Sequence, residues 1–364
     1  MGARASVPEG TGGSDHDRRL GVGFERRLPR LVRSGSVAGG AAGSEGEVAA
    51  SGRKMAEVPV PEINENQLLV KNLFMSVDPY MRGRMIDRKS YIPPFQVGQA
   101  LEGGSVGEVL ESNHGQFQTG DVVVSFLGWR EYFVSDGVGL TKIDPGETPV
   151  QAYLGTLGMP GLTAYCGLLD IGKPVAGETV FVSAASGAVG SIVAQIARIK
   201  GCKVVGSAGS DEKVAWLKET AGARDAFNYK TAVDLVETVG RLCPDGIDVY
   251  YENVGGLHLE AALEHMNTGG RIVMCGLIDQ YNATEPPAGP SNLGYVISKK
   301  LRMQGFIVMD YMDRLPQFYA DMGKWIADGA IQWKETVMEG IEQAPAAFIG
   351  LFEGRNFGKM VVKL

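Results

Sequence analysis

The segment from Thr179 to Gly190, TVFVSAASGAVG, constrains the fold of this chain more than any other. It reads as an apolar strand that breaks into a glycine-spaced turn and continues as SIVAQIARIKG, an amphipathic helix. Such a turn places unpaired N–H groups and the positive end of a helix dipole where they can hold a pyrophosphate. Ala185, Gly187 and Gly190 stand at the glycine positions of a variant G-x-G-x-x-G pattern. Because glycine-rich turns also occur without a ligand, the motif alone leaves a structural role open.

The segments after this turn alternate between strand and helix patterns. The runs KVVGSAG, DAFNYK, IDVYYENVGG, RIVMCGLI and RMQGFIVMDY read as strands, and amphipathic segments separate most of them. This alternation predicts a parallel sheet with helices on both faces. Such a sheet binds its ligand beyond the carboxyl ends of the strands. The sequence therefore predicts an α/β fold with a Rossmann-type domain that holds a dinucleotide at the glycine turn.

The second strand of the series indicates which dinucleotide binds. NAD sites usually carry an acidic residue about 20 residues beyond the first glycine, where it binds the ribose hydroxyls. Here that stretch reads GSAGS over residues 206–210 and contains Ser207 but no acid. A small polar loop followed by Lys213 would accept a ribose phosphate, which favours NADP (NADPH) over NAD. Asp211 counts against this interpretation unless it points away, and Lys213 could instead be a solvated lysine.

Composition limits the classes of function. A chain of 364 residues with 44% hydrophobic residues is long enough for two domains and a large core. A net charge of −7 argues against nucleic acid as a partner, and no apolar run is long enough to span a membrane. The four cysteines are scattered, which predicts buried thiols in a reducing, cytoplasmic setting. Neither they nor the four histidines show a zinc-like spacing, so we expect no metal site.

Residues 1–54 differ from the rest of the chain. They contain twelve glycines, eight arginines and a single aromatic residue, Phe24. Such a composition buries too little surface to offset the entropy of ordering, so we expect a disordered or non-native leader. An organelle transit peptide is disfavoured by the six acidic residues of this segment. An upstream extension or a reading-frame artefact is favoured, with Met55 as the start or the point where the native frame resumes.

From Glu57 onward the sequence carries several family motifs. DPYMR, GMPGLTAY, ENVGG and the terminal NFGK together resemble the zinc-independent medium-chain dehydrogenase/reductases. Within that superfamily, the chain is most similar to the prostaglandin and alkenal double-bond reductases, especially the bacterial NADPH-dependent curcumin reductases. The resemblance covers about the last 300 residues. Relatives normally begin with a strand and hairpin before the VPVPE segment, and nothing in residues 1–54 resembles it.

The resemblance implies a division into domains. A GroES-like catalytic domain of mostly antiparallel strands is built from residues 55–148 and 313–364. The Rossmann domain that binds NADP occupies residues 149–312 between these two parts. Members of the family commonly form homodimers, so we expect one here.

The resemblance also assigns roles to individual residues. The family residues around the cofactor correspond here to Ala185, Ser186, Gly187, Ala188, Gly190, Ser207, Lys213, Tyr229, Asn253, Cys275, Gly276, Tyr281, Phe306, Ile307, Val308 and Asn356. Several have a structural alternative: Tyr229 could be an ordinary strand aromatic, Asn253 a turn former, and Asn356 a cap for the last strand.

The implied reaction is the reduction of a carbon–carbon double bond conjugated to a carbonyl. NADPH supplies the hydride, and the protein must stabilise the negative charge that reaches the carbonyl oxygen. Tyrosine suits this task without a metal, because its hydroxyl, with a pKa near ~10, keeps its proton at neutral pH. Tyr281 and Tyr91 match family tyrosines that face the substrate and the nicotinamide ribose, and Tyr80 is a third candidate whose core role is favoured.

The substrate is thus expected to be a small hydrophobic conjugated carbonyl of the curcumin, alkenal or oxo-lipid type. Two alternatives stay open. A quinone oxidoreductase of the same fold would use the same cofactor on a related conjugated carbonyl. A non-catalytic NADP-binding protein would keep the fold without the reaction.

Overall fold

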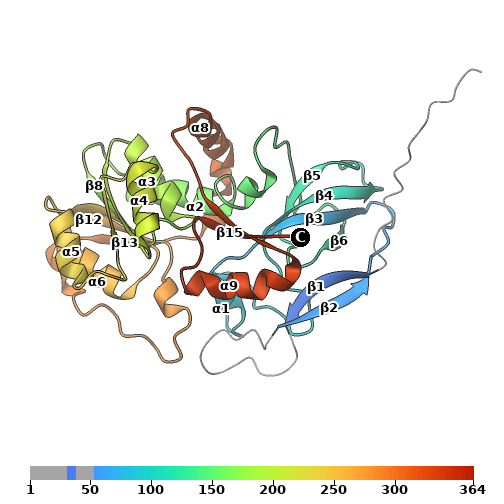
Figure 1. The fold of residues 1–364 in the computed structure, drawn as a ribbon, viewed down its shortest axis with the longest axis horizontal. Coiled ribbons are helices and arrows are strands. Elements are labelled where there is room, and N and C mark those ends of the chain that lie inside the picture. The colour runs from blue at the N-terminus through green and yellow to red at the C-terminus, as the bar shows by residue number, and fades with distance from the viewer. Residues whose placement is uncertain (1–30, 38–52) are drawn as a thin grey trace, which may run out of the picture.

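A computed structural model describes residues 31–37 and 53–364 of the chain. Two lobes lie side by side, each built around one sheet (Figure 1). In one lobe, six parallel strands lie in the order β10-β9-β8-β11-β12-β13. The strands are β8 (Thr179–Val182), β9 (Lys203–Ala208), β10 (Asp225–Asn228), β11 (Ile247–Glu252), β12 (Met266–Met274) and β13 (Arg302–Gly305). The order reverses between β8 and β11, as in sheets that bind a dinucleotide at that point.

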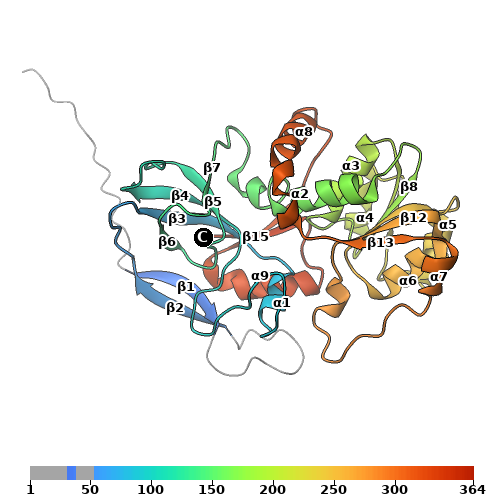
Figure 2. The same cartoon turned by 180° about the vertical axis from the view of Figure 1, so that it is seen from behind.

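Helices cover both faces of this parallel sheet (Figure 2). One face carries α2 (Met159–Cys166), α3 (Gly190–Ile199), α4 (Asp211–Glu219) and α8 (Leu315–Ala327). The other carries α5 (Leu235–Leu242), α6 (Gly256–His265) and α7 (Gly294–Ser298). The side chains of Ser210 and Asp234 accept hydrogen bonds from the first turns of α4 and α5, as N-caps do. The alternation of strand and helix patterns therefore predicted this domain correctly.

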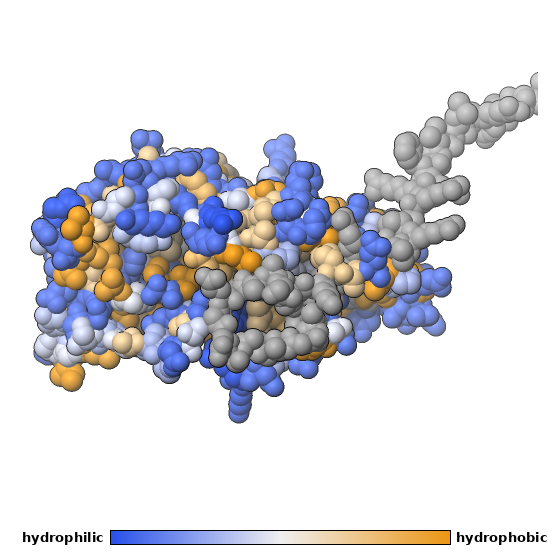
Figure 3. All heavy atoms as spheres, turned by 60° about the horizontal axis from the view of Figure 1, so that its bottom comes forward, coloured by the Kyte–Doolittle hydropathy of each residue, from blue (hydrophilic) through white to orange (hydrophobic). Residues whose placement is uncertain are grey.

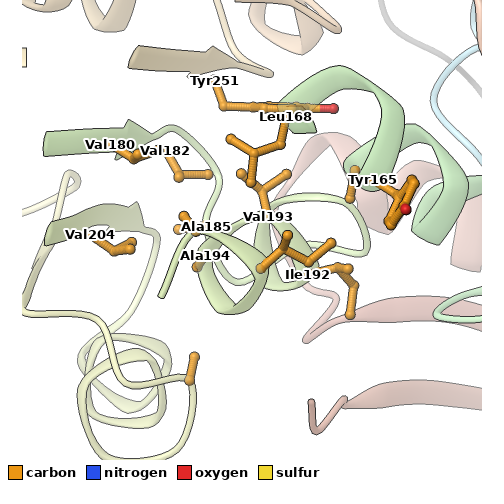
Figure 4. Close-up of a cluster of buried hydrophobic side chains, with 14 of the residues drawn as sticks. Tyr165, Leu168, Val180, Val182, Ala185, Ile192, Val193, Ala194, Val204 and Tyr251 are labelled. Atoms are coloured by element: carbon orange, nitrogen blue, oxygen red, sulfur yellow. The ribbon is translucent and has the colours of Figure 1, made fainter. Parts of the chain in front are cut away.

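Side chains along each central strand alternate between the two faces. Val180 and Val182 of β8 point into a core shared with Ile192 and Val193 of α3 (Figure 4). Phe181, between the two valines, lies in the core on the opposite face and stacks on Tyr250 with ring centroids 5.1 Å apart. All six side chains are fully buried. Burial of each contributes on the order of 1.5–3 kcal/mol to folding, so the strand that leads into the glycine turn is firmly held.

The second lobe is a mostly antiparallel sheet built from both ends of the chain. Its order is β14-β15-β3-β4-β5-β7, with β6 paired to β3. The strands are β3 (Leu68–Ser76), β4 (Ser105–Ser112), β5 (Val122–Ser125), β6 (Tyr132–Ser135), β7 (Thr141–Ile143), β14 (Glu335–Glu339) and β15 (Lys359–Lys363), and two helices, α1 (Met81–Arg84) and α9 (Ala344–Phe352), belong to this lobe. The expected GroES-like, mostly antiparallel domain is therefore confirmed.

A two-stranded antiparallel pair precedes this sheet. It joins β1 (Leu31–Val37) to β2 (Arg53–Pro59). The prediction of disorder over residues 1–54 differs from the structure at these strands, because backbone pairing with β2 orders a segment that lacks an apolar pattern of its own. The rest of that leader lies outside the described residues. Within the described part of the chain, no helix combines the length and apolar character needed to cross a bilayer.

Candidate active site

The glycine turn lies between β8 and α3, at the edge of the sheet where the strand order reverses. A Cβ on Gly190 would lie 2.3 Å from the carbonyl oxygen of Ala184, so a side chain there would force the turn to move. Ala184 itself adopts a positive φ of 47°. On the neighbouring strand, a Cβ on Gly206 would lie 2.7 Å from the Ala185 side chain. The close packing of small residues leaves the backbone at the start of α3 as the surface available to an anion.

The residues of the turn divide between packing and exposure. Ala185 is fully buried in the core, and its N–H donates to the Ser207 carbonyl at 2.8 Å. Ser186 is also buried, and its carbonyl accepts a hydrogen bond from the Gly358 N–H at 2.9 Å. Gly187 and Ala188 are partly exposed. Of the predicted pyrophosphate residues, these two are therefore the ones whose backbone can meet a ligand, while Ala185 shapes the turn.

A segment from the other lobe lies against this turn. Gly358 forms a backbone bridge with Gly187, immediately before β15 begins. Asn356, two residues earlier, donates from its side-chain amide to the Gly358 carbonyl at 2.9 Å. That bond matches the strand-capping alternative for Asn356 and also holds its side chain beside the turn. The segment that the NFGK motif marks is thus brought to the predicted cofactor site across the two lobes.

Positive charge gathers at the carboxyl end of β9. The amine of Lys213 donates to the Gly354 carbonyl at 2.7 Å. A Cβ on Gly354 would lie 3.9 Å from the amine of Lys230 and 4.0 Å from the hydroxyl of Tyr229. Partial burial and the charge of Lys230 lower the pKa of Lys213. No carboxylate in the described ranges forms a salt bridge with either lysine.

Lys230 was not among the residues that the sequence predicted for this site. Its only signal was its position directly after Tyr229 in the NYK motif. Asp211 counted against a phosphate site, but its carboxylate accepts a hydrogen bond from the side-chain amide of Asn228 at 2.8 Å. Ser207 is fully buried, and its hydroxyl has no hydrogen-bond partner in the described part of the protein. Two lysines that form no salt bridge with a described carboxylate, a tyrosine hydroxyl and a serine loop fit a phosphate group.

The ENVGG motif lies at the carboxyl end of β11. Asn253 donates from its backbone to the Ser183 hydroxyl and from its side chain to the Ser183 carbonyl, at 2.8 and 2.7 Å. The buried carboxyl of Glu252 accepts hydrogen bonds from the same Ser183 hydroxyl and from the Val254 N–H. Burial raises the pKa of Glu252. These bonds tie the ends of β8 and β11 together next to the turn, a role that differs from the turn former that the sequence offered as the alternative for Asn253.

Tyr281 follows a short 3-10 turn, η4 (Ile278–Gln280), beyond β12. Its hydroxyl oxygen accepts a hydrogen bond from the Leu277 N–H at 3.2 Å. This geometry leaves the hydroxyl proton available to another acceptor. Burial raises the pKa of Tyr281, and the hydroxyl lies close to Gly276, where a Cβ would be 3.2 Å away. Burial also raises the pKa of the neighbouring Cys275 to about 12, so this thiol is neutral.

Tyr91 comes to the same region from the antiparallel lobe. Loss of solvent around its hydroxyl raises its pKa first, followed by the proximity of Tyr281. The charge of Cys275 also raises the pKa of Tyr91, and next to Tyr281 the Arg82 Nε donates to the Asn282 side-chain oxygen across the two lobes at 3.0 Å. The Tyr80 hydroxyl is buried without a partner among the described residues, and its ring packs on the core of its own lobe. Tyr80 thus has the surroundings of a core residue, whereas Tyr91 lies on an exposed loop.

The last predicted cofactor segment lies just beyond β13. The strand ends at Gly305, so Phe306, Ile307 and Val308 follow it rather than form part of it. Phe306 and Val308 pack against the core that contains α3. The phenyl ring of Phe306 meets Tyr311 edge-on, with centroids 6.0 Å apart. The three residues therefore lie at the carboxyl end of the sheet, as the cofactor assignment requires.

Metal chemistry needs a set of donors that converge. Among residues 31–37 and 53–364, no group of three or more His, Cys, Asp or Glu side chains is placed to hold a metal ion. The four cysteines have no disulfide partner. The donor sets typical of zinc are thus not provided by the described residues.

Comparison with known proteins identifies two family models that match this chain. Residues 41–143 match a family model described as the N-terminal domain of oxidoreductase, and residues 188–327 match one described as zinc-binding dehydrogenase, whose zinc site the described donors do not fit. The first match begins inside residues 1–54, where the sequence predicted no resemblance to the family.

Three relatives cover most of the chain. The NADPH-dependent curcumin reductase of Escherichia coli is 45% identical over 316 residues, covering 85% of this chain and 91% of the relative. The NADP-dependent 2-alkenal reductase of Nicotiana tabacum is 48% identical over 310 residues, covering 84% and 89%. The crystal structure of CurA from Vibrio vulnificus in complex with NADPH superposes with a TM-score of 0.86 at 42% identity, covering 91% and 98%. This chain belongs to the medium-chain dehydrogenase/reductase family, in its branch of prostaglandin and alkenal double-bond reductases.

Proposed function

We propose that this protein uses NADPH to reduce the carbon–carbon double bond of α,β-unsaturated ketones and aldehydes. The observation that carries the proposal is the place of Tyr281 just beyond β12, at the carboxyl edge of the parallel sheet, next to the 3.0 Å hydrogen bond from Arg82 to Asn282 that joins the two lobes. Relatives named for curcumin and alkenal reduction, at 45% and 48% identity, support it. The substrate class is a small, hydrophobic conjugated carbonyl.

The cofactor would lie along the carboxyl edge of the sheet, from the two lysines to Tyr281. Lys213, Lys230 and Tyr229 would hold the ribose phosphate, because two cations without carboxylate partners attract a dianion. Gly187, Ala188 and the start of α3 would hold the pyrophosphate. Cys275, Gly276 and Phe306 to Val308 would line the nicotinamide end. When bound, NADPH supplies a hydride to the carbon that lies beta to the carbonyl.

The protein's own task is to stabilise charge and to deliver a proton. As the double bond accepts a hydride, negative charge moves to the carbonyl oxygen. Tyr281 holds its proton, because burial raises its pKa and its oxygen already accepts a backbone N–H bond. It can therefore donate to the developing oxyanion without being ionised first. Tyr91 can donate to the same oxygen or relay the proton that reaches the alpha carbon.

Turnover measurements on matched substrates test this proposal. Oxidation of NADPH is followed with an alkenal, an enone and a quinone, and the products are identified. We expect reduction of the alkenal and enone, with a saturated carbonyl as the product. Turnover of the quinone alone would indicate a quinone oxidoreductase. Tight binding of NADPH with no turnover on any of them, unchanged by Tyr281→Phe, would indicate a non-catalytic NADP-binding protein.

Three further features of the protein belong to this proposal. The proposed division falls at residues 148/149 and 312/313, although α8, which lies beyond the second boundary, packs against the core of the parallel sheet. A homodimer is supported by exposed apolar side chains that come just before and just after edge strand β13 in the chain, namely Ile297, Met309 and Met312. A cytoplasmic location is supported by four unpaired cysteines.

A further inference from the structure

The loop that carries Tyr91 has little structure of its own. Between α1 and β4 the chain makes turns and bends without a helix or a strand, apart from bridge residues at Ala100 and Gly103. Tyr91 is 60% exposed and Val97 58%. The space-filling view shows hydrophobic residues gathered in patches on a largely hydrophilic face (Figure 3). A tyrosine on such a loop keeps a fixed direction only if something outside the loop holds it.

Arg84, the last residue of α1, supplies such a hold. Its Nε donates to the Pro93 carbonyl at 2.9 Å, and its Nη2 meets the Glu102 carboxylate at 2.8 Å. The guanidinium carbon lies 4.1 Å from the centroid of the Phe95 ring. The backbone carbonyl of Arg84 accepts the Phe95 N–H at 2.7 Å. One residue therefore fastens the loop at three places beyond Tyr91.

The chemistry of these contacts is specific to arginine. The side chain of Arg84 is 6% exposed, and burying a charge is costly unless its hydrogen bonds are satisfied. A guanidinium can donate along two edges while its flat face stacks on an aromatic ring. A lysine in this place could keep the charge but would make only part of this set. The loop is thus held by geometry as well as by charge.

We propose that Arg84 is a positioning residue for Tyr91, fixing the loop so that the tyrosine hydroxyl faces Tyr281 and the reacting carbonyl. This inference rests on the proposed enone reduction. The positive charge of Arg84 also lowers the pKa of Tyr91 and of Tyr80, which is opposite to the effect of burial. Arg84 acts through the loop in this arrangement, because its Nε and Nη2 donate to Pro93 and Glu102 and its side chain is 6% exposed.

Arg84→Lys tests the geometric part of the inference. We expect kcat for an enone to fall on the order of 10- to 100-fold, because small displacements of a catalytic group have effects of this size. The Kd for NADPH should stay unchanged. Hydrogen exchange of the peptide over residues 86–98 should become faster, which reports directly on the loop. Arg88→Lys, in the same loop, is the matched control and should leave both kcat and exchange as in the wild type.

A double-mutant cycle separates positioning of Tyr91 from a general structural effect. If Arg84 acts through Tyr91, then Arg84→Lys should cause little further loss in a Tyr91→Phe background. Equal losses in both backgrounds would overturn the inference, and so would wild-type turnover of Tyr91→Phe. If Arg84→Lys fails to fold, Glu102→Ala replaces it. Glu102 is half-exposed, and its variant removes the acceptor of the Nη2 bond while Arg84 stays in place.

A failure of the proposed function would give a different experimental result from a failure of the role of Arg84. In that case the wild-type protein itself would not turn over an alkenal or an enone. Wild-type turnover combined with additive losses in the cycle would instead retain the reaction and reject the role of Arg84.

Discussion

At the scale of single residues, the cofactor preference depends on a contact that no local pattern encodes. The sequence singled out Lys213 and Tyr229 from short motifs, but it missed Lys230. Lys213 donates to the carbonyl of Gly354, 141 residues further along the chain, and Lys230 and Tyr229 lie near the same glycine. The side-chain bond of Asn253 to Ser183, 70 residues away, was equally hidden, whereas Asn356 bonds a carbonyl only two residues further on. Residue types could be predicted here, whereas their partners required the folded chain.

Lys213→Ala and Lys230→Ala test the phosphate site. Each should raise the KM for NADPH on the order of 10-fold, because each removes a charge-assisted hydrogen bond to a dianion. The KM for NADH, which lacks this phosphate, should hardly change. Lys218→Ala is the control, since Lys218 lies on the same helix but pairs with Asp225. An equal rise for both cofactors would reject a role in phosphate recognition.

His258 offers a test of stability against pH. It is buried against the ring of Tyr229, and burial lowers its pKa from 6.5 to about 4. The unfolded chain therefore takes up a proton between pH 6.5 and about 4 that the folded protein excludes, so the free energy of unfolding should fall as the pH decreases through this window. His258→Phe should reduce this pH dependence in urea titrations, and an unchanged slope between pH 6.5 and 4.5 would contradict it.

At the scale of elements, the sequence predicted the strand–turn–helix unit well because its signals are local. An apolar run, small residues and an amphipathic helix follow one another between Thr179 and Ile199. The pattern did not predict which residues of the turn pack inside the protein and which are exposed. Ala185, expected at the pyrophosphate, is buried in the core, and its N–H donates to the Ser207 carbonyl. The β1–β2 pair was missed for a related reason, since its first strand is ordered by pairing and not by an apolar pattern.

Gly190→Ala should show how little room the turn has. A methyl group 2.3 Å from the Ala184 carbonyl must displace backbone, which we expect to cost about 1–3 kcal/mol of stability. The same shift should weaken NADPH binding. Gly323→Ala, in α8 with open space around it, should instead stabilise the protein by about 0.5–1 kcal/mol. Urea unfolding measures the stability of each variant, and a cofactor titration measures its affinity for NADPH. Wild-type stability and affinity in Gly190→Ala would contradict the tight turn.

At the scale of the whole molecule, the candidate site exists only where the two lobes meet. Tyr91 and the segment ending at Gly358 come from one lobe, and the glycine turn and Tyr281 from the other. A hydrogen bond of 3.0 Å from Arg82 to Asn282 adds a direct link between the lobes beside Tyr281. Composition predicted two domains, but the resemblance to a family was needed to place their junction, because the motifs of the site are spread over most of the chain.

The oligomeric state can be tested at the same scale. Ile297 is 83% exposed and Met309 52%, on either side of edge strand β13. Light scattering on a sizing column should give twice the mass of one chain. Ile297→Glu with Met309→Lys should shift the protein to the monomer, because charges would have to be buried in the interface. Val233→Glu is the control, because Val233 is fully exposed, and this variant should not change the oligomeric state. A monomeric wild type would reject the dimer.

The position of β15 has a consequence for how the protein acquires its shape during synthesis. All six strands of the parallel sheet precede β14 and β15 in the chain, and β15 lies inside the other sheet, between β14 and β3. The parallel sheet can therefore assemble while β3 still lacks its neighbour on that side. Until β15 emerges from the ribosome, the nascent chain holds an unfinished sheet with an open edge, which makes this interval the one in which chaperones are most needed.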